Sequence, residues 1–222
     1  AQSDFNTLWQ INSRMAVGVE AEARLLALTG QEETALQRLK AFRNDVGRHP
    51  ALLALAKEIE SGRVAQPAAL TAAEGTALAF YIATAPQASQ GYGDAAAAYF
   101  ALAVYLDPTL DAAKAPWADA LDRANRRDDA IALLQTIPED SVHHTSAQGQ
   151  LAWALRREGR DEEALATARA TLAQTENRNI RIQLADLLQS LGRDGEAEKI
   201  FTQVIEADEA IGEYDWRIYF AR

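Results

Sequence analysis

The histidines are the residues of this chain best suited to metal or acid–base chemistry, and their placement argues against both roles. They are His49, His143 and His144, and the 222-residue sequence contains no cysteine. His143 and His144 are adjacent, so on a helix their side chains point about 100° apart and do not bind one ion together. Without cysteine, thiolate metal ligands, a cysteine nucleophile and disulfide bonds are excluded. The sequence therefore predicts no metal site and no cofactor.

Clusters of acidic residues are the next candidates, because paired carboxylates act as acid and base in many enzymes. The clusters Glu32–Glu33, Asp128–Asp129 and Asp161–Glu163 all fall where a helix is expected to begin. There, acidic side chains cap free N–H groups and complement the helix dipole. The sequence contains no glycine-rich phosphate loop, G-x-S-x-G elbow or H-E-x-x-H motif. We therefore expect no catalytic residues and no enzymatic activity.

The composition favours an acidic, all-helical protein. Lys and Arg total 22 against 32 Asp and Glu, which gives a net charge of −10. Such a chain lacks the basic surface that binding to nucleic acid or to anionic membranes requires. The 47 alanines and 25 leucines favour helices over strands. The longest stretch without charge, residues 75–93, contains Pro86 and several Gly, Ser and Gln, so no membrane span is expected.

Short segments recur along the chain at a nearly constant spacing. Gly159–Leu165 (GRDEEAL) has counterparts in Gly192–Glu198 (GRDGEAE), Asn125–Ile131 (NRRDDAI) and Gly30–Leu36 (GQEETAL). Each copy ends one helix, begins the next with an acidic residue, and places a small residue where two antiparallel helices meet. These second-helix alanines are Ala35, Ala96, Ala130, Ala164 and Ala197, at separations of 61, 34, 34 and 33 residues. Twelve residues before four of them lie the first-helix alanines Ala23, Ala118, Ala152 and Ala185.

This spacing resembles the tetratricopeptide repeat, a helix–turn–helix unit of about 34 residues. The resemblance implies an all-α fold, a right-handed α–α superhelix of antiparallel helix pairs (a TPR-like solenoid). The consensus tryptophan is missing throughout, and most copies lack the closing proline. The matching residues are Ala96, Phe100, Ala103 and Pro108 in one copy and Leu184, Ala185, Leu188, Ala197 and Phe201 in the last.

The resemblance divides residues 1–222 into the parts of one solenoid. Because 61 is not a multiple of 34, we expect the region after the first repeat to be irregular. Between Arg63 and Asp94 only Glu74 is charged, either because this region is buried in the superhelix or because it offers a partner an apolar surface. The expected parts are repeat 1 (14–46), an irregular helical insert (47–75), repeat 2 (76–108), repeat 3 (110–137), repeat 4 (143–174), repeat 5 (178–207) and the first helix of a truncated repeat (213–222).

Hydrophobic periodicity, with prolines in the breaks, predicts the helices themselves. They are expected at residues 4–29, 32–45, 50–61, 69–84, 94–106, 110–124, 127–136, 143–158, 161–174, 178–191, 194–207 and 213–222.

A binding groove is the remaining candidate for a functional site. The resemblance implies that the first helices of successive repeats line a concave face. The residue after each of three first-helix alanines is Asp119, Trp153 or Asp186, and the same stripe continues one helical turn further along. The candidate partner-binding residues are Asp119, Asp122, Arg123, Trp153, Arg156, Arg157, Asp186 and Gln189, with Ser190 beside them.

Trp and Arg are common anchors of protein interfaces, so the stripe predicts a peptide site in which Arg156 and Arg157 grip acidic groups. Two alternatives stay open: Trp153 packs as core against the neighbouring repeat, and the arginines pair with nearby Glu on a solvated face. Some tetratricopeptide arrays hold a peptide's terminal carboxylate with Asn and Lys. Here Asp119 and Asp186 stand in the corresponding places, which argues against that activity.

Two short segments, Tyr99–Pro108 and Asp215–Arg222, look like bacterial envelope tetratricopeptide proteins, which are secreted or lipid-anchored adaptors. The resemblance implies a periplasmic or envelope location, with the cytoplasm as the alternative. It also implies a chain cut from a longer protein, since residues 1–10 do not form a signal peptide. The aromatic residues of 213–222 need a second helix or another molecule to cover them. We expect this helix to be frayed or buried in an intermolecular contact, so homo-oligomers are possible.

Taken together, the sequence predicts an adaptor that binds a peptide or partner protein in its concave groove. The alternative is a self-assembling scaffold built by stacking of solenoid ends. An enzyme or the regulatory subunit of one is the third and least supported class.

Overall fold

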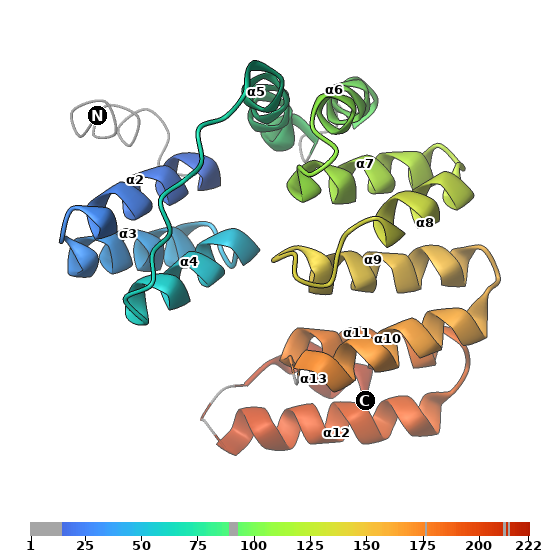
Figure 1. Cartoon of the computed structure of the whole chain (residues 1–222). Coiled ribbons are helices and arrows are strands. Elements are labelled where there is room, and N and C mark those ends of the chain that lie inside the picture. Colours follow the sequence, from blue (N-terminus) through green and yellow to red (C-terminus); the bar gives the residue numbers. More distant parts are fainter. Residues whose placement is uncertain (1–14, 89–92, 176, 211, 213) are drawn as a thin grey trace. The chain divides into compact units, whose positions relative to one another are not determined.

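A computed structural model shows the chain as a series of helices joined by short loops (Figure 1). It describes residues 15–88, 93–175, 177–210, 212 and 214–222, and these residues contain no strand. The predicted all-α fold is confirmed. Contacts divide the chain into two compact units: residues 1–92 with 102–110, and residues 93–101 with 111–222.

The first unit is built on a helix pair followed by a third helix. The second-helix alanine Ala35 and the first-helix alanine Ala23 are fully buried where α2 and α3 pack together. Leu39, Phe42 and Leu55 complete the core with them, and Pro50 begins the third helix, where its missing N–H costs nothing. The helices are α2 (Ala16–Leu28), α3 (Glu32–Asp45), α4 (Pro50–Glu60) and, further along, α5 (Ala72–Ala88).

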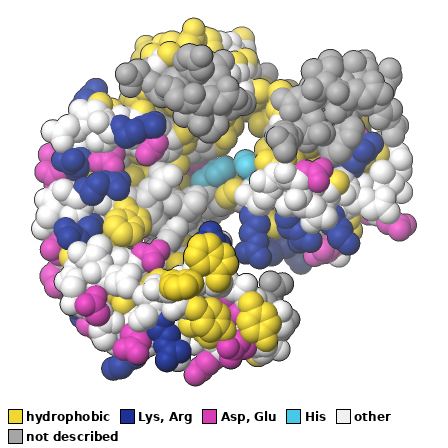
Figure 2. Space-filling model, turned by 180° about the vertical axis from the view of Figure 1, so that it is seen from behind, with side chains coloured by type: hydrophobic (Ala, Val, Ile, Leu, Met, Phe, Trp, Pro, Cys, Tyr) yellow, Lys and Arg dark blue, Asp and Glu magenta, His cyan; other side chains and the backbone are white. Residues whose placement is uncertain are grey.

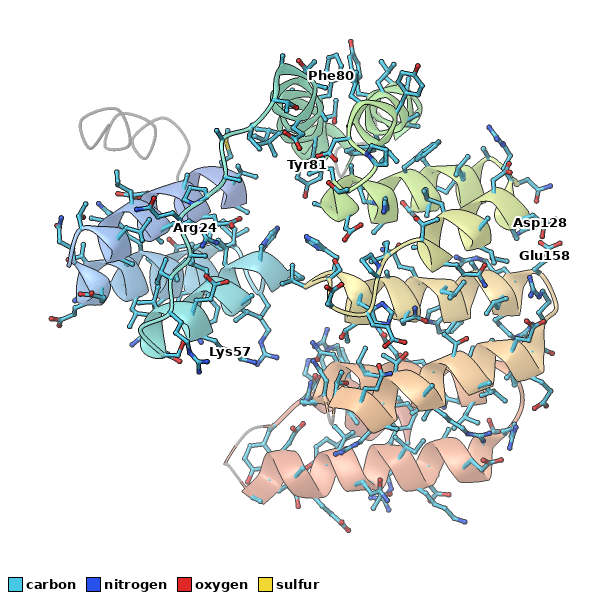
Figure 3. The ribbon with its side chains drawn as sticks, in the orientation of Figure 1. Arg24, Lys57, Phe80, Tyr81, Asp128 and Glu158 are labelled. Atoms are coloured by element: carbon cyan, nitrogen blue, oxygen red, sulfur yellow. The ribbon has the colours of Figure 1, made fainter. Side chains whose placement is uncertain are left out.

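The segment 61–71, between α4 and α5, is not helical and is largely exposed. Arg24 of α2 donates hydrogen bonds to Glu58 of α4 (3.1 Å) and to the carbonyl oxygen of Ala65 (3.2 Å), so it ties this segment to both helices (Figure 3). A capping box then sets the start of α5. The backbone N–H of Thr71 donates to Glu74 (2.6 Å), and that of Glu74 donates to the Thr71 hydroxyl (3.3 Å).

The second unit stacks helix pairs in chain order (Figure 1). Helices α7 and α8, α9 and α10, and α11 and α12 form the pairs, and α13 packs on α12. Each first helix also contacts the pair before it, which gives one continuous core. The helices are α6 (Gly93–Leu106), whose last residues belong to the first unit, α7 (Asp111–Arg123), α8 (Arg127–Gln135), α9 (His144–Arg157), α10 (Asp161–Thr175), α11 (Arg178–Ser190), α12 (Asp194–Ala210) and α13 (Trp216–Ala221).

The alanines predicted from the repeat spacing lie at the centre of these pairs. Their exposed fractions are at most 3% in the second unit, because a small side chain there lets two helix backbones approach closely. The turn before each second helix needs a left-handed residue. Gly159 and Gly192 have φ of 79° and 69°, and Asn125 takes the same place with φ of 62°.

Most expected helix boundaries agree with the structure, and the differences have local causes. The helix expected at 69–84 spans Ala72–Ala88, because Thr71 and Glu74 cap its start. The last helix begins at Trp216 rather than 213, because the Asp215 side chain accepts the N–H of Arg217 as an N-cap. Helix α12 continues to Ala210. The first half of the helix expected at 4–29 lies outside the described residues.

Candidate binding groove

A cavity of about 350 Å³ opens on the face of the second unit that α7, α9 and α11 form. The predicted residues Asp119 and Asp122 reach it from α7, and Trp153 and Arg157 reach it from α9. The structure therefore brings four of the eight candidate residues together. Other residues that line the cavity are Ser146, Gly149, Gln150 and Gln183.

The carboxylate of Asp122 forms ion pairs with two arginines at this cavity. The side chain of Asp122 is only 10% exposed, and its partners are Arg127 (3.2 Å) and Arg157. Arg127 also lies 3.8 Å from Glu158, which is labelled in Figure 3 beside Asp128. The positive charge of Arg157 is therefore balanced within the protein. At the rim, Asp119 is paired with Arg123 at 3.0 Å.

Arg156, expected beside Arg157 in the groove, does not line the cavity. Its guanidinium donates to the carbonyl oxygen of Ser190 (2.9 Å) and lies 3.4 Å from Asp161. These contacts join the end of α9 to the start of α10 and the end of α11. Arg156 thus holds neighbouring repeats together.

Trp153 packs partly against the core and is partly open to the cavity. The residue is half-buried. An indole in this position offers a ligand an apolar surface that is already fixed by packing, so little conformational entropy is lost on binding.

Gln183 of α11 is the functional candidate that sequence reasoning missed. Its Oε1 is buried and accepts no hydrogen bond from the described residues. Gly149 makes room for it, since a Cβ at position 149 would lie 2.5 Å from this oxygen. Gln150 and Gln183 precede Trp153 and Asp186 by three residues, so they extend the predicted stripe by one turn toward the helix N-termini.

Asp186 lies in a neighbouring cavity of about 490 Å³, which shares Gln183 with the first. Burial raises the pKa of the Asp186 carboxyl. No ion pair is formed by Asp186 among the described residues, although Arg178 and Arg217 line the same cavity. The remaining candidate, Gln189, donates to the carbonyl oxygen of Ala221 (2.7 Å) and so fixes the end of α13.

Helix α13 is docked by one face and exposed on the other. Ile218 is buried in the core, and Arg178 pairs with Asp208 (2.7 Å) and Asp215 (3.4 Å) at the start of the helix. Trp216 and Phe220 contact each other edge-to-face but are 68% and 85% exposed. Figure 2 shows apolar side chains gathered over this end of the second unit.

Two other kinds of site are absent from the residues that the structure describes. No cluster of three or more His, Asp or Glu side chains is placed to hold a metal ion. None of the described helices combines the length and the apolar character needed to cross a bilayer.

Comparison with known proteins bears on the helix pair α11–α12. Residues 179–211, which span this pair, match the tetratricopeptide repeat family. The sequence of this one helix pair is thus similar to a tetratricopeptide repeat. No curated protein matches its sequence.

Solved structures of tetratricopeptide type share the fold. A thermophilic TPR protein of Thermus thermophilus superimposes with a TM-score of 0.55 at 17% identity, over 91% of this chain and 97% of that one. The MamA RS-1 ArsTM double mutant superimposes with a TM-score of 0.51 at 15% identity, over 96% and 99% of the two chains. At these identities the similarity concerns the fold alone.

Proposed function

We propose that this protein is a non-enzymatic interaction module whose second unit binds an extended peptide along α7, α9 and α11. The observation that carries the proposal is the unpaired Oε1 of Gln183 beside the half-buried ring of Trp153. A buried acceptor without a donor costs free energy, and this cost is removed when the Gln183 side chain turns toward the cavity and accepts a backbone N–H of a bound peptide. The tetratricopeptide fold supports an interaction or scaffold role in general.

The side chains of the groove also favour one ligand chemistry. The arginines that were expected to grip acidic groups are already engaged, Arg157 with Asp122 and Arg156 with Ser190 and Asp161. Among the described residues, the Gln183 oxygen has no donor and the Asp186 carboxylate forms no ion pair. We therefore favour a peptide that donates backbone N–H groups to Gln183 and a Lys or Arg side chain toward Asp186.

Two labelled peptides of equal length test this function, one with two lysines around a central leucine and one with glutamates in their place. Fluorescence anisotropy should show tighter binding of the lysine peptide to the intact chain. Gln183→Leu and Asp186→Asn should each weaken it about tenfold, which corresponds to about 1.4 kcal/mol. Trp216→Ala, an exposed residue outside the groove, is the control. Equal binding of both peptides, or unchanged binding by both groove variants, would contradict the proposal.

A second candidate, self-association, is favoured by the exposed aromatic face of α13. Trp216 and Phe220 together expose more apolar surface than isolated surface residues normally do. If this face joins copies of the chain, the mass measured by light scattering should rise with concentration. Trp216→Ser with Phe220→Ser should abolish the rise, whereas Tyr105→Ser, equally exposed on α6, should not. A single mass at all concentrations would rule this candidate out.

A further inference from the structure

A second cleft lies in the first unit, between α3 and α4, and has a volume of about 190 Å³. Its walls are apolar, with Leu39 and Phe42 from α3 and Leu52, Leu53 and Ala56 from α4. Phe42 and Leu52 belong to the core, whereas Leu53 is exposed. The cleft shares no residue with the groove of the second unit, and none of its residues belongs to the predicted stripe.

The repeat spacing identifies what is unusual about this cleft. Ala56 follows the second-helix alanine Ala35 by 21 residues, just as Ala185 follows Ala164 by 21. Ala56 is therefore a first-helix alanine, the residue against which a second helix packs. Its equivalents in the second unit are covered to at least 97% of their surface, but Ala56 is half-buried and lines the open cleft.

The second helix that should cover Ala56 is missing from its place. The spacing of twelve residues seen in the other repeats would centre this helix on Ala68. Ala68 lies instead in the non-helical segment 61–71, and none of that segment lines the cleft. Among the described helices, those that pack on α4 are α2 and α3. Helix α4 is thus a first helix whose partner position is empty within the described residues.

The second unit shows what an occupant of that position contacts. There α12 covers α11, and its Glu196 pairs with Arg169 of the preceding second helix α10 at 3.2 Å. Arg169 follows Ala164 by five residues, and Lys40 follows Ala35 by five. Lys40 on α3 is therefore the equivalent of Arg169 on α10. In the second unit, Arg169 pairs with the acidic first turn of α12, the second helix of the following repeat.

The charge around the cleft agrees with this register. Lys40, Arg43 and Arg48 line it, and none of the three forms an ion pair with the described residues. Glu60 is the acidic side chain that the described part of the cleft contains. The rim is therefore positive in a chain that carries a net charge of −10.

We propose that the α3–α4 cleft binds an amphipathic helix of a partner protein, which completes the interrupted repeat in trans. The helix would pack an apolar stripe with a small residue against Ala56. Acidic residues in its first turns would pair with Lys40, Arg43 and Arg48. Repeats of this class bury their hydrophobic faces only by stacking on a neighbouring helix, and amphipathic helices commonly bind in such grooves.

The chain's own α12 supplies a probe with the required chemistry. A labelled peptide of residues 194–210 carries Glu196, Ala197 and Phe201 on one amphipathic helix. It should bind the full-length chain, and a peptide with lysine in place of Glu196 and Glu198 should bind more weakly. Binding is measured by fluorescence anisotropy, and its location by hydrogen exchange of α3 and α4.

Variants of the chain localise the binding. Ala56→Leu fills the small position and Lys40→Glu reverses the charge, and each should weaken the peptide about tenfold. Lys57→Glu is the matched control. Lys57 is exposed on α4, the helix that carries Ala56 (Figure 3), but it does not line the cleft. Thermal melts establish that the variants fold like the parent.

Three results would overturn the proposal. The first is no saturable binding up to about 1 mM peptide. The second is an equal loss of affinity in Lys57→Glu and Lys40→Glu, which would show that only net charge matters. The third is a dimer of the free chain that Ala56→Leu dissociates, which would make a second copy the occupant.

Discussion

At the scale of single residues, the alanine at each helix contact links the sequence pattern to the fold. Ala164 is 0% exposed on α10, whereas Ala166, two residues further along the same helix, is exposed. The repeat spacing predicted which alanine is buried, because only a small residue fits between two closely packed helices. The spacing carries this information independently of hydrophobicity, since both residues are alanine.

Replacing Ala164 with leucine should therefore overpack the contact of α9 and α10. We expect Ala164→Leu to lower the free energy of unfolding by about 1–3 kcal/mol. Ala166→Leu adds the same atoms on the exposed side and should change stability by less than about 0.5 kcal/mol. Urea unfolding of the two variants measures both values. Equal stability of Ala164→Leu and the parent would show that the register is wrong.

The carboxylate of Asp215 makes a second prediction at this scale. Hydrogen bonds, first from the Arg217 side chain and also from its backbone N–H and from Arg178, lower its pKa from 3.8 to about 2. Because the pKa is lower in the folded state, the stabilisation is fully present above about pH 4 and is lost as the pH falls through 2. Asp215→Asn should loosen α13 at pH 6, and its difference from the parent should shrink between pH 4 and 2.

Amide hydrogen exchange of residues 216–221, compared between parent and variant at each pH, tests this. The comparison cancels the intrinsic pH dependence of exchange. A difference between the two proteins that stays constant down to pH 2 would contradict the role given to the ionised carboxylate.

At the scale of helices, local sequence signals account for most of the boundaries. Left-handed residues end the first helices, and acidic residues begin the second helices. Helix α5 begins later than hydrophobic periodicity predicts, because the capping box of Thr71 and Glu74 sets its first turn. The sequence did not predict the missing second helix after α4. A helix was expected at 69–84, which includes the residues next to Ala68, but the helix begins only at Ala72.

The turns between helices of a pair allow a test of this account. Gly159 has φ of 79°, so Gly159→Ala should destabilise the protein by about 1–2 kcal/mol, the cost of placing a Cβ in this conformation. Asn125→Gly should stabilise it slightly, because glycine adopts the same conformation without that cost. Gly195 lies in the first turn of α12 with open space around it, so Gly195→Ala should stabilise by up to about 0.5 kcal/mol.

Denaturant midpoints of these three variants give the comparison. The signs of the stability changes matter more than their sizes. Opposite signs for Gly159→Ala and Gly195→Ala would distinguish an effect of backbone conformation from one of helix propensity. A loss of stability in Asn125→Gly would contradict the left-handed role of that position.

At the scale of the whole molecule, the sequence predicted the positions of the site residues along the helices but not the partners of their side chains. Repeat spacing predicted Asp119 and Trp153 on one face, and both line the same cavity. It did not reveal that Arg156 bonds to Ser190 or that Gln189 bonds to Ala221, because these contacts depend on how long side chains reach across neighbouring helices. Because Arg156 and Arg157 are paired within the protein, we propose a basic peptide for the groove, whereas the sequence alone favoured an acidic one.

The distribution of charge follows the same division. Asp and Glu outnumber Lys and Arg by 23 to 14 in residues 93–222, but only by 8 to 7 in residues 15–88. The acidic excess thus lies mainly in the part that contains the groove, where the unpaired Asp186 favours a basic peptide. The rim of the α3–α4 cleft is positive instead and favours an acidic helix.

Two sites with opposite charge preference should bind their ligands independently. We expect saturation of the chain with the lysine peptide to leave the affinity for the α12 peptide unchanged within about twofold, because neither probe carries the charge that the other site selects. Raising the salt concentration from about 0.1 M to about 1 M shortens the Debye length from about 10 Å to about 3 Å, so both affinities should fall. Competition measured by anisotropy with two different labels, at both salt concentrations, checks this. Because the probes have opposite charge, free peptides that pair in solution would imitate competition, and a titration of one peptide with the other in the absence of protein controls for that. Mutual displacement beyond this control would mean that both probes bind one surface, which would contradict the assignment of two sites.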